Sequence, residues 1–301
     1  MHSLIEVCGK QIRITGKFVK IARLEADTYH FIDDPEAMLD GLRKCGTRID
    51  LFTFMQTLRE PTPKYKYPLE WANMAVAPSA SYEEWWKQIT SEARNRSKQA
   101  EKKGIVIREV PFDDELAMGI WEIYNETPFR QGRPFSHYGK DFESVKREEA
   151  TFLDTSIFIG AFLNEKLVGF VKLTTDEART QANLMNILSM VSERDKAPTN
   201  ALIAHSVKAC AKRGISHLVY QRFFYGTKKW DGLMRFKQVN GFQSVDVPRF
   251  YVPLTALGWA AYRLGLHQRL VDRLPGNVAE KLRSIRASWN ARKMSSVKEG
   301  A

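Results

Sequence analysis

One loop of the sequence combines residue types that could bind an anionic substrate and move a proton. It reads NETPFRQGRPFSHYGKDF and alternates apolar with basic residues around two glycines. Guanidinium groups bind phosphate or carboxylate, and a histidine accepts a proton near neutral pH. The candidates are Arg130, Gln131 and Arg133 for substrate binding, with His137 and Tyr138 at the reacting end. The alternative is a surface loop with its aromatic side chains tucked underneath.

A second polar and aromatic segment, YQRFFYGTKKWDG, follows an apolar strand. Open α/β sheets bind ligands at the C-terminal ends of their strands, so this segment is a second candidate. We expect Tyr220 and Arg222 to bind substrate, Tyr225 to relay a proton, and Lys228 to stabilise an oxyanion or hold a phosphate. The alternative is core aromatic residues and solvated lysines. Farther along, Arg235 and Lys237 are expected on a helix surface.

The stretch ILSMVSERDKAPTNAL has the order strand, loop and helix that often binds phosphate at a helix N-terminus. Its loop contains no glycine. The candidate phosphate-binding residues are Arg194, Lys196, Thr199 and Asn200.

The sequence does not indicate covalent or metal-based chemistry. It has no Cys/His or Ser/His signature, and its three cysteines lie far apart with no C-x-x-C pair. Histidines do not cluster either, and His205 and His217 are expected to be core or edge residues. Direct attack of one substrate on another, with no metal and no tightly bound cofactor, fits these residues.

Composition indicates a folded chain. Its 301 residues are 44% hydrophobic and 11% aromatic, enough for a substantial core. The chain does not open with a secretory signal pattern, and the run LTALGWAAYRLGL is too short to span a bilayer. We therefore expect a cytoplasmic protein that is soluble or peripherally membrane-associated.

Positive charge concentrates in two regions of a chain whose net charge is +11. The helix-like stretch WKQITSEARNRSKQAEKKG carries six Lys or Arg, and residues 257–301 carry nine Lys or Arg against three acids. Such clusters suit a polyanion such as RNA, a nucleotide diphosphate or an anionic lipid surface, although solvated helix faces are the alternative. An apolar stripe in residues 256–301 adds peripheral contact with an anionic membrane as a hypothesis.

Hydrophobic periodicity divides the chain near Gly104. Before it we expect short strands and then one long helix over residues 81–104, with Ser81 as its N-cap. After it, the predicted order is strand 105–110, helix 113–127, a loop and helix to residue 150, a hairpin turning at residues 164–166, strand 183–191, helix 199–214, strand 215–223, helix 230–240 and a hairpin over 242–254.

This order, with three local motifs, resembles the GNAT acyltransferase fold over residues 105–254. The motifs are the hairpin AFLNEKLVGFVKL, the stretch ILSMVSERDKAPTNAL at the place of the donor-binding loop, and the helix end FKQVNGF. Arg194, Ala197 and Thr199 stand at the spacing of the family's phosphate loop. However, neither glycine position of that loop holds glycine, and Pro198 removes one N–H donor.

The segments ARNRSKQAEKKGIVIRE and RGISHLVYQRFFYG are similar to the FemAB-like subgroup, whose members consist of two GNAT-like halves. The resemblance implies an α/β (α+β) fold with a mixed central sheet flanked by helices. It also implies a shortened N-terminal half (1–104), a GNAT domain (105–255) and a basic helical C-terminal extension (256–301).

The resemblance further implies transfer of an acyl or aminoacyl group from an activated donor to an amine of a cell-envelope or polysaccharide precursor. The donor would be aminoacyl-tRNA or an acyl thioester such as acyl-CoA. Two alternatives stay open: a non-catalytic RNA-binding module, and a coenzyme A dependent N-acetyltransferase with an atypical loop.

Overall fold

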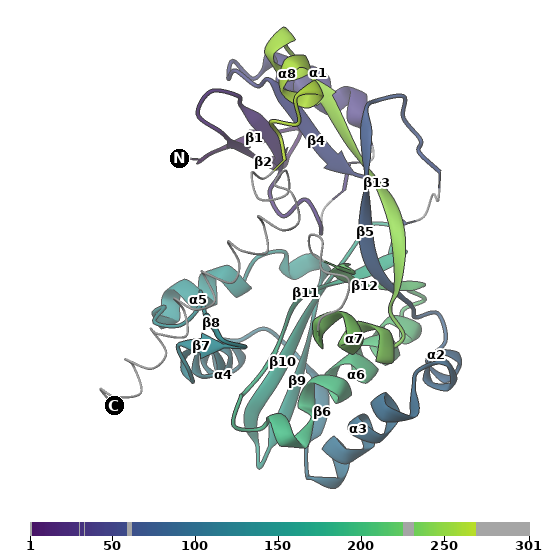
Figure 1. Ribbon diagram of the computed structural model, residues 1–301. Coiled ribbons are helices and arrows are strands. Elements are labelled where there is room, and N and C mark those ends of the chain that lie inside the picture. Colours follow the sequence, from purple (N-terminus) through teal and green to yellow (C-terminus); the bar gives the residue numbers. More distant parts are fainter. Residues whose placement is uncertain (1, 30, 33, 59–61, 225–231, 269–301) are drawn as a thin grey trace.

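The computed structural model describes residues 2–29, 31–32, 34–58, 62–224 and 232–268. In this part of the chain, one continuous eleven-stranded sheet runs through the molecule (Figure 1). From edge to edge its strands are β1 (His2–Val7), β2 (Lys10–Thr15), β3 (Ile21–Leu24), β4 (Leu51–Met55), β13 (Gln243–Pro253), β5 (Leu69–Pro78), β12 (His217–Arg222), β11 (Gln181–Ser189), β10 (Lys166–Thr175), β9 (Ser156–Leu163) and β6 (Val106–Val110). A separate short hairpin pairs β7 (Phe129–Arg130) with β8 (Arg133–Pro134).

Helices cover both faces of the sheet. On one face of the second half, α6 (Pro198–Lys212) packs on β9, β10 and β11 and is itself covered by α2 (Tyr82–Gln88) and α3 (Ser91–Lys102). The other helices are α4 (Asp114–Asn125) and α5 (Phe142–Glu149), which pack together beside β10, α7 (Gly232–Val239), and in the first half α1 (Pro35–Lys44) and α8 (Ala256–Arg263).

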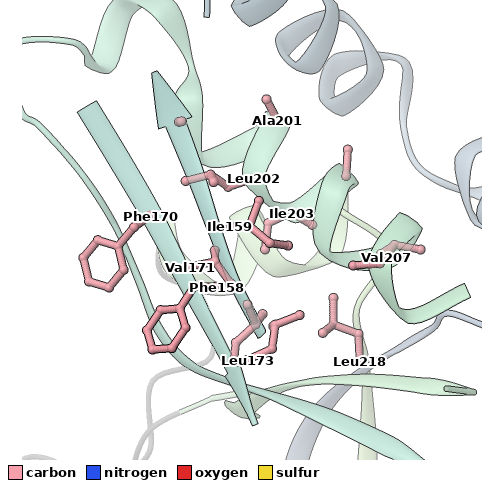
Figure 2. Packing of buried hydrophobic residues seen from close by; sticks show 14 of the residues in the cluster. Phe158, Ile159, Phe170, Val171, Leu173, Ala201, Leu202, Ile203, Val207 and Leu218 are labelled. Carbon is pink, nitrogen blue, oxygen red and sulfur yellow. The ribbon is translucent and has the colours of Figure 1, made fainter. Parts of the chain in front are cut away.

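The main core lies on both sides of β9 and β10. Figure 2 shows Val171 and Leu173 on the side of the sheet that faces α6, whereas Phe158 and Phe170 point away from that helix. Phe170 meets Tyr124 of α4 with ring centroids 5.9 Å apart. Because both faces of these strands are buried, the sequence reads as a nearly continuous apolar run. Full burial of each such side chain contributes about 1.5–3 kcal/mol.

The long strand β13 joins the two halves of the sheet. Its residues from Gln243 to Phe250 pair with β5, and its residues from Arg249 to Pro253 pair with β4 on the opposite edge. Smaller cores lie in the first half, around Phe52 and Phe250, and at the junction, around Met74 and Val219. The halves therefore share both backbone pairing and buried side chains.

Strands β11 and β12 separate soon after they meet. They pair in parallel over only three residue pairs, from Gln181 with His217 to Asn183 with Val219. Beyond that point the Tyr29 hydroxyl donates to the Met185 carbonyl (3.4 Å) and accepts from Gln221 Nε2 (2.6 Å). A side chain from the first half thus bridges the two separated strands.

The expected single helix over residues 81–104 is wrong, because α2 and α3 are distinct helices. Ile89 and Thr90 between them are extended, and the Thr90 side chain caps α3 by accepting from the Ala93 N–H. Extended backbone suits these two β-branched residues. Ser81 does cap α2, as expected.

The expected hairpin over residues 242–254 is also wrong, because these residues form the single strand β13. Pro248 reads as a turn signal, but it lies inside the strand, where it pairs with Trp71 of β5 and its carbonyl accepts from the Gln56 N–H just beyond β4. Position 104, the expected domain boundary, falls between α3 and β6. Trp85 before it and Ile105 after it belong to one buried cluster.

We predict that Gly241→Ala destabilises the fold much more than Gly214→Ala. Both glycines have positive φ (82° and 69°), a backbone conformation that costs an alanine about 1–2 kcal/mol. At Gly241 a Cβ would also lie 2.9 Å from Trp85 Nε1 and from Ile89 Cγ2, whereas nothing lies within 4 Å at Gly214. Overpacking adds about 1–3 kcal/mol at Gly241 only. Urea unfolding measures both; equal losses would contradict the packing argument.

Candidate active site

The first predicted loop is an ordered bridge between α4 and α5. The turn between β7 and β8 places Gln131 and Gly132 at positive φ (51° and 72°), so Gln131 lies exposed at its tip beside exposed Arg133. After the turn, the loop folds back over α4. The His137 ring lies 4.4 Å from the Tyr124 ring, and Tyr138 is exposed.

His137 is half-buried between aromatic and charged groups. Phe135 packs against its ring, Lys140 Nζ lies 3.4 Å from its Nδ1, and Glu148 is 3.7 Å away. Burial lowers the pKa of His137, Lys140 lowers it further, and Glu148 partly opposes them. A neutral imidazole at pH 7 that retains contact with solvent can accept a proton.

Arg130 joins α4 to the end of β11. Its guanidinium donates to the carbonyls of Ser189 and Ile123, both at 2.7 Å, and pairs with Glu126. The Glu126 carboxylate in turn accepts from the N–H groups of Val191 (2.6 Å) and Ser192 (2.9 Å). Burial works to raise the pKa of Glu126, but these N–H groups and Arg130 hold it below its usual range.

A buried polar array lies beneath the loop and consists of Tyr124, Glu149, Lys172 and Asn186. The Glu149 carboxylate accepts from the Tyr124 hydroxyl (2.8 Å) and from Asn186 Nδ2 (2.8 and 3.0 Å). Lys172 Nζ donates to the Glu149 carbonyl (2.6 Å) and to the Thr151 carbonyl (2.7 Å). Burial raises the pKa of Glu149 and lowers that of Lys172 to about 8, while their mutual attraction opposes both shifts.

The buried polar array meets the point where the strands separate. Asn186 belongs to β11 and follows Met185, whose carbonyl accepts from Tyr29. Next to Tyr29, a cavity of about 220 Å³ lies between the two halves, and Phe31, Asp176 and Glu177 also line it. The loop between α4 and α5, called the acceptor loop below, reaches β11 through Arg130 at Ser189, and the polar array reaches it through Asn186. The cavity is not lined by β11, but its wall residue Tyr29 bonds to Met185 of that strand.

On the opposite face, the loop between β11 and α6 holds the predicted phosphate-binding residues. Arg194 is exposed, while Lys196 pairs with Glu193. The Thr199 hydroxyl lies 3.0 Å from that of Ser189, and Asn200 Nδ2 donates to Asn240. Ala197 takes the left-handed conformation (φ 56°) that glycine usually supplies.

The second predicted segment is described only to residue 224 before the gap, so Tyr225 and Lys228 lie outside the described residues. Tyr220 is half-buried against Phe242, and Arg222 is exposed. Lys237, expected on a helix surface, is instead fully buried. Its ammonium donates to the Arg222 carbonyl and lies 4.6 Å from the centre of the Tyr220 ring. A buried cation thus stands at the C-terminal end of β12.

Sequence reasoning missed Glu149, Lys172 and Lys237. Lys172 stands inside the apolar run GFVKL, and a charged residue in a buried strand is the one signal that marks a polar site. Arg235, by contrast, is exposed and pairs with Glu92, as a surface position requires. Within the described residues, no group of three His, Cys, Asp or Glu is arranged to hold a metal ion, and no helix is long and apolar enough to cross a membrane.

Comparison with known proteins identifies the fold. No protein-family model and no curated protein sequence matches the chain. Similar solved structures include the C-terminal domain of a putative lysylphosphatidylglycerol synthetase from Agrobacterium fabrum (14% identity, 87% of each chain covered, TM-score 0.54). They also include L-PGS from Bacillus licheniformis (13%, 87% of this chain and 88% of that one, 0.55) and FemX (12%, 88% and 89%, 0.51). The chain has the FemAB-like GNAT fold that its motifs predicted.

We predict that Lys172→Met lowers the free energy of unfolding by about 2–4 kcal/mol at pH 7, because it strands buried carbonyls. The folded pKa of about 8 lies below the ordinary 10.5, so between these values the unfolded chain holds a proton that the folded chain has released. Wild-type stability should therefore rise with pH relative to the variant in this window. Urea unfolding at pH 7, 9 and 10 measures both effects.

Lys166→Met is the matched control for that measurement, because Lys166 begins the same strand with a side chain that is 59% exposed. It should change stability by no more than about 0.5 kcal/mol. A wild-type advantage over Lys172→Met that stays constant from pH 7 to 10 would show that the buried lysine does not titrate as argued.

Proposed function

We propose that the protein is an acyltransferase that moves an acyl or aminoacyl group from an activated donor to an amine. The observation that carries the proposal is the separation of β11 and β12. The half-buried His137 and the buried polar array lie on the α4–α5 side of this point, and the buried Lys237 lies on the α6–α7 side. Two substrates could approach one stretch of β11 from opposite faces and react directly.

The donor, in this proposal, is held on the α6 side. Exposed Arg96, Lys98 and Lys102 of α3 give this side a positive surface, and Lys103 reaches from α3 to Asp195 in the loop before α6 (2.7 Å). A positive helix surface beside this loop favours a polyanionic donor. The loop offers less to a pyrophosphate, because Pro198 has no N–H. We therefore favour aminoacyl-tRNA over an acyl thioester.

The acceptor amine approaches from the acceptor loop and the cavity between the halves. The amine first releases one proton to solvent, which frees the lone pair of its nitrogen. As this nitrogen bonds to the donor carbonyl carbon, a neutral His137 takes the second proton that the nitrogen loses, and positive charge from Lys237 offsets the charge on the carbonyl oxygen. Collapse of the intermediate breaks the bond to the tRNA hydroxyl or thiol, which leaves with the proton that His137 returns. Arg133 and Gln131 at the loop tip would then contact the acceptor.

The class of acceptor is proposed from the cavity between the two halves. One similar structure is named as a lysylphosphatidylglycerol synthetase domain. An amine-bearing cell-envelope or polysaccharide precursor fits the cavity, which combines Tyr29 and Phe31 with the carboxylates of Asp176 and Glu177. Carboxylates attract an amine that arrives protonated.

A non-catalytic RNA-binding module is the second candidate, favoured by the glycine-free loop before α6. It predicts salt-sensitive binding to tRNA irrespective of charging, and no transfer. A coenzyme A dependent N-acetyltransferase with an atypical loop is the third.

Thermal unfolding with separate ligands tests the donor. A ligand that binds the native state raises the melting temperature, so aminoacyl-tRNA should stabilise the protein more than uncharged tRNA, and acetyl-CoA should not. Equal stabilisation by both tRNA forms, without transfer to any amine, would favour the binding module. Stabilisation by acetyl-CoA alone would overturn the choice of donor.

We predict that His137→Gln lowers kcat by about 10²–10⁴-fold, because the amine loses its proton acceptor. In the wild type, activity should fall as the pH drops through a pKa below the ordinary 6.5, and this inflection should vanish in the variant. The measurement is the pH dependence of kcat, with circular dichroism as a folding check.

His205→Gln is the matched control. His205 is also half-buried with its pKa lowered, by burial and then by Lys208, but it lies on α6 away from the acceptor loop. Its replacement should leave both kcat and the pH profile unchanged. An unaltered profile in His137→Gln would remove His137 from the mechanism.

A further inference from the structure

Exposed apolar side chains gather at the end of the first half. Of the fourteen exposed large apolar residues in the described chain, five lie in the loop between β2 and β3 or on α8 and the turn after it. These five are Phe18, Leu257, Trp259, Leu264 and Leu266. Phe18 is 79% exposed and Leu264 is 70% exposed. Isolated exposed apolar residues need no explanation, but this concentration does.

The buried Asp50 carboxylate binds both the β2–β3 loop and the start of α8 at the same end of the sheet. Asp50 is fully buried and accepts from the Lys20 N–H (2.8 Å) at the end of the β2–β3 loop and from the Thr255 hydroxyl (2.9 Å), the N-cap of α8. Arg48 pairs with Asp50 (3.1 Å) and also contacts the Phe18 carbonyl. The loop and the start of α8 therefore project from the sheet beside each other, held by a single polar centre.

The packing of α8 leaves its outer side apolar. Gly258 and Ala261 face the sheet, and a Cβ at Gly258 would lie 1.8 Å from the Asp50 carbonyl oxygen. With Gly258 and Ala261 against the sheet, Leu257 and Leu264 are exposed on one flank of α8 and Trp259 is exposed on the other. Figure 1 shows α8 at the end of the molecule opposite to α3 and β6, so the apolar side is remote from the proposed active site.

The charges of both segments have one sign. Residues 16–20 contain Lys17 and Lys20, residues 256–268 contain Arg263, and neither segment contains an acidic residue. The Arg263 guanidinium lies 5.4 Å from the centre of the Trp259 ring. Lysine and arginine stems lie along apolar surface while their charged ends stay in water, and tryptophan prefers the boundary between water and lipid.

We propose that the β2–β3 loop and α8 form a docking surface for an anionic lipid bilayer. Phe18, Trp259 and Leu264 enter the interface, and Lys17 and Arg263 contact anionic headgroups. A bilayer fits better than a second protein copy, because the loop and α8 carry basic residues and no acidic residue of their own, so two copies of this surface repel each other. The docking surface includes α8, which is the described part of the apolar stripe expected over residues 256–301, and adds the β2–β3 loop, which the sequence did not indicate. It does not depend on the proposed acyl transfer.

Vesicle flotation of the full chain tests the docking surface. The wild type should float with phosphatidylcholine vesicles that contain phosphatidylglycerol and much less with pure phosphatidylcholine, and high salt should reduce binding. Phe18→Ser and Trp259→Ser should each weaken partitioning by about tenfold, because each removes buried apolar area. Lys17→Glu should weaken binding to the anionic vesicles alone.

Val106→Ser and Leu153→Ser are the matched controls, since both side chains are exposed (56% and 44%) but lie on β6 and near β9. They should float like the wild type, and all variants should keep its melting temperature. No binding of the wild type to anionic vesicles, or equal binding by Phe18→Ser and Trp259→Ser, would overturn the proposal. Self-association that Trp259→Ser abolishes, without vesicle binding, would identify a second copy as the occupant instead.

Discussion

Strands β11 and β12 stop pairing after three residue pairs, so the backbone groups of β11 beyond Asn183 need other hydrogen-bond partners. The arrangement of the candidate site depends on which groups take that place. A buried carbonyl without a donor is costly, so other groups must satisfy the exposed edge of β11. The Tyr29 hydroxyl does so at Met185, and the Arg130 guanidinium does so at Ser189. Each comes from an element outside the strand pair. The separation thus recruits the first half and the acceptor loop to the same stretch of β11.

The contact between Arg130 and Ser189 brings a charged group into a partly buried place, and that charge needs a partner. Once Arg130 reaches Ser189, its charge is compensated by Glu126, whose carboxylate occupies the N–H groups of Val191 and Ser192. Lys172 and Glu149, beneath the acceptor loop, are also buried charged groups that neighbours compensate. Lys172 donates to backbone carbonyls, and the Glu149 carboxylate accepts from Asn186. Paired buried charges of this kind add little net stability, but removing one partner strands the other. We infer that such pairs hold the acceptor loop in one conformation.

Local sequence signals predicted much of the second half. The hairpin turn was predicted at residues 164–166, and Asn164 and Glu165 both adopt positive φ there (49° and 62°), with β10 beginning at Lys166. Before residue 104, Ser81 caps α2 as predicted. The signals failed where tertiary contacts decide. Pro248 reads as a turn until β4 and β5 are seen to pair with different stretches of one strand. Lys237 reads as a surface residue because nothing local indicates that Arg222 and Tyr220 will enclose it.

The site residues divide in the same way. His137 and Gln131 were predicted as site residues from residue type and loop composition, which are local properties. Glu149 and Asn186 are 37 positions apart, and their pairing depends on how α5 meets β11, which no spacing rule encodes. The glycine-free loop before α6 is partly readable from the sequence and partly only from the structure. Its sequence revealed that a glycine was missing, but only the structure shows Ala197 in the left-handed conformation that glycine would have taken. Ala197 thus supplies the left-handed backbone while Pro198 lacks an N–H, and under the proposed function that combination favours a donor held by charge on α3 over one held by N–H groups of the loop.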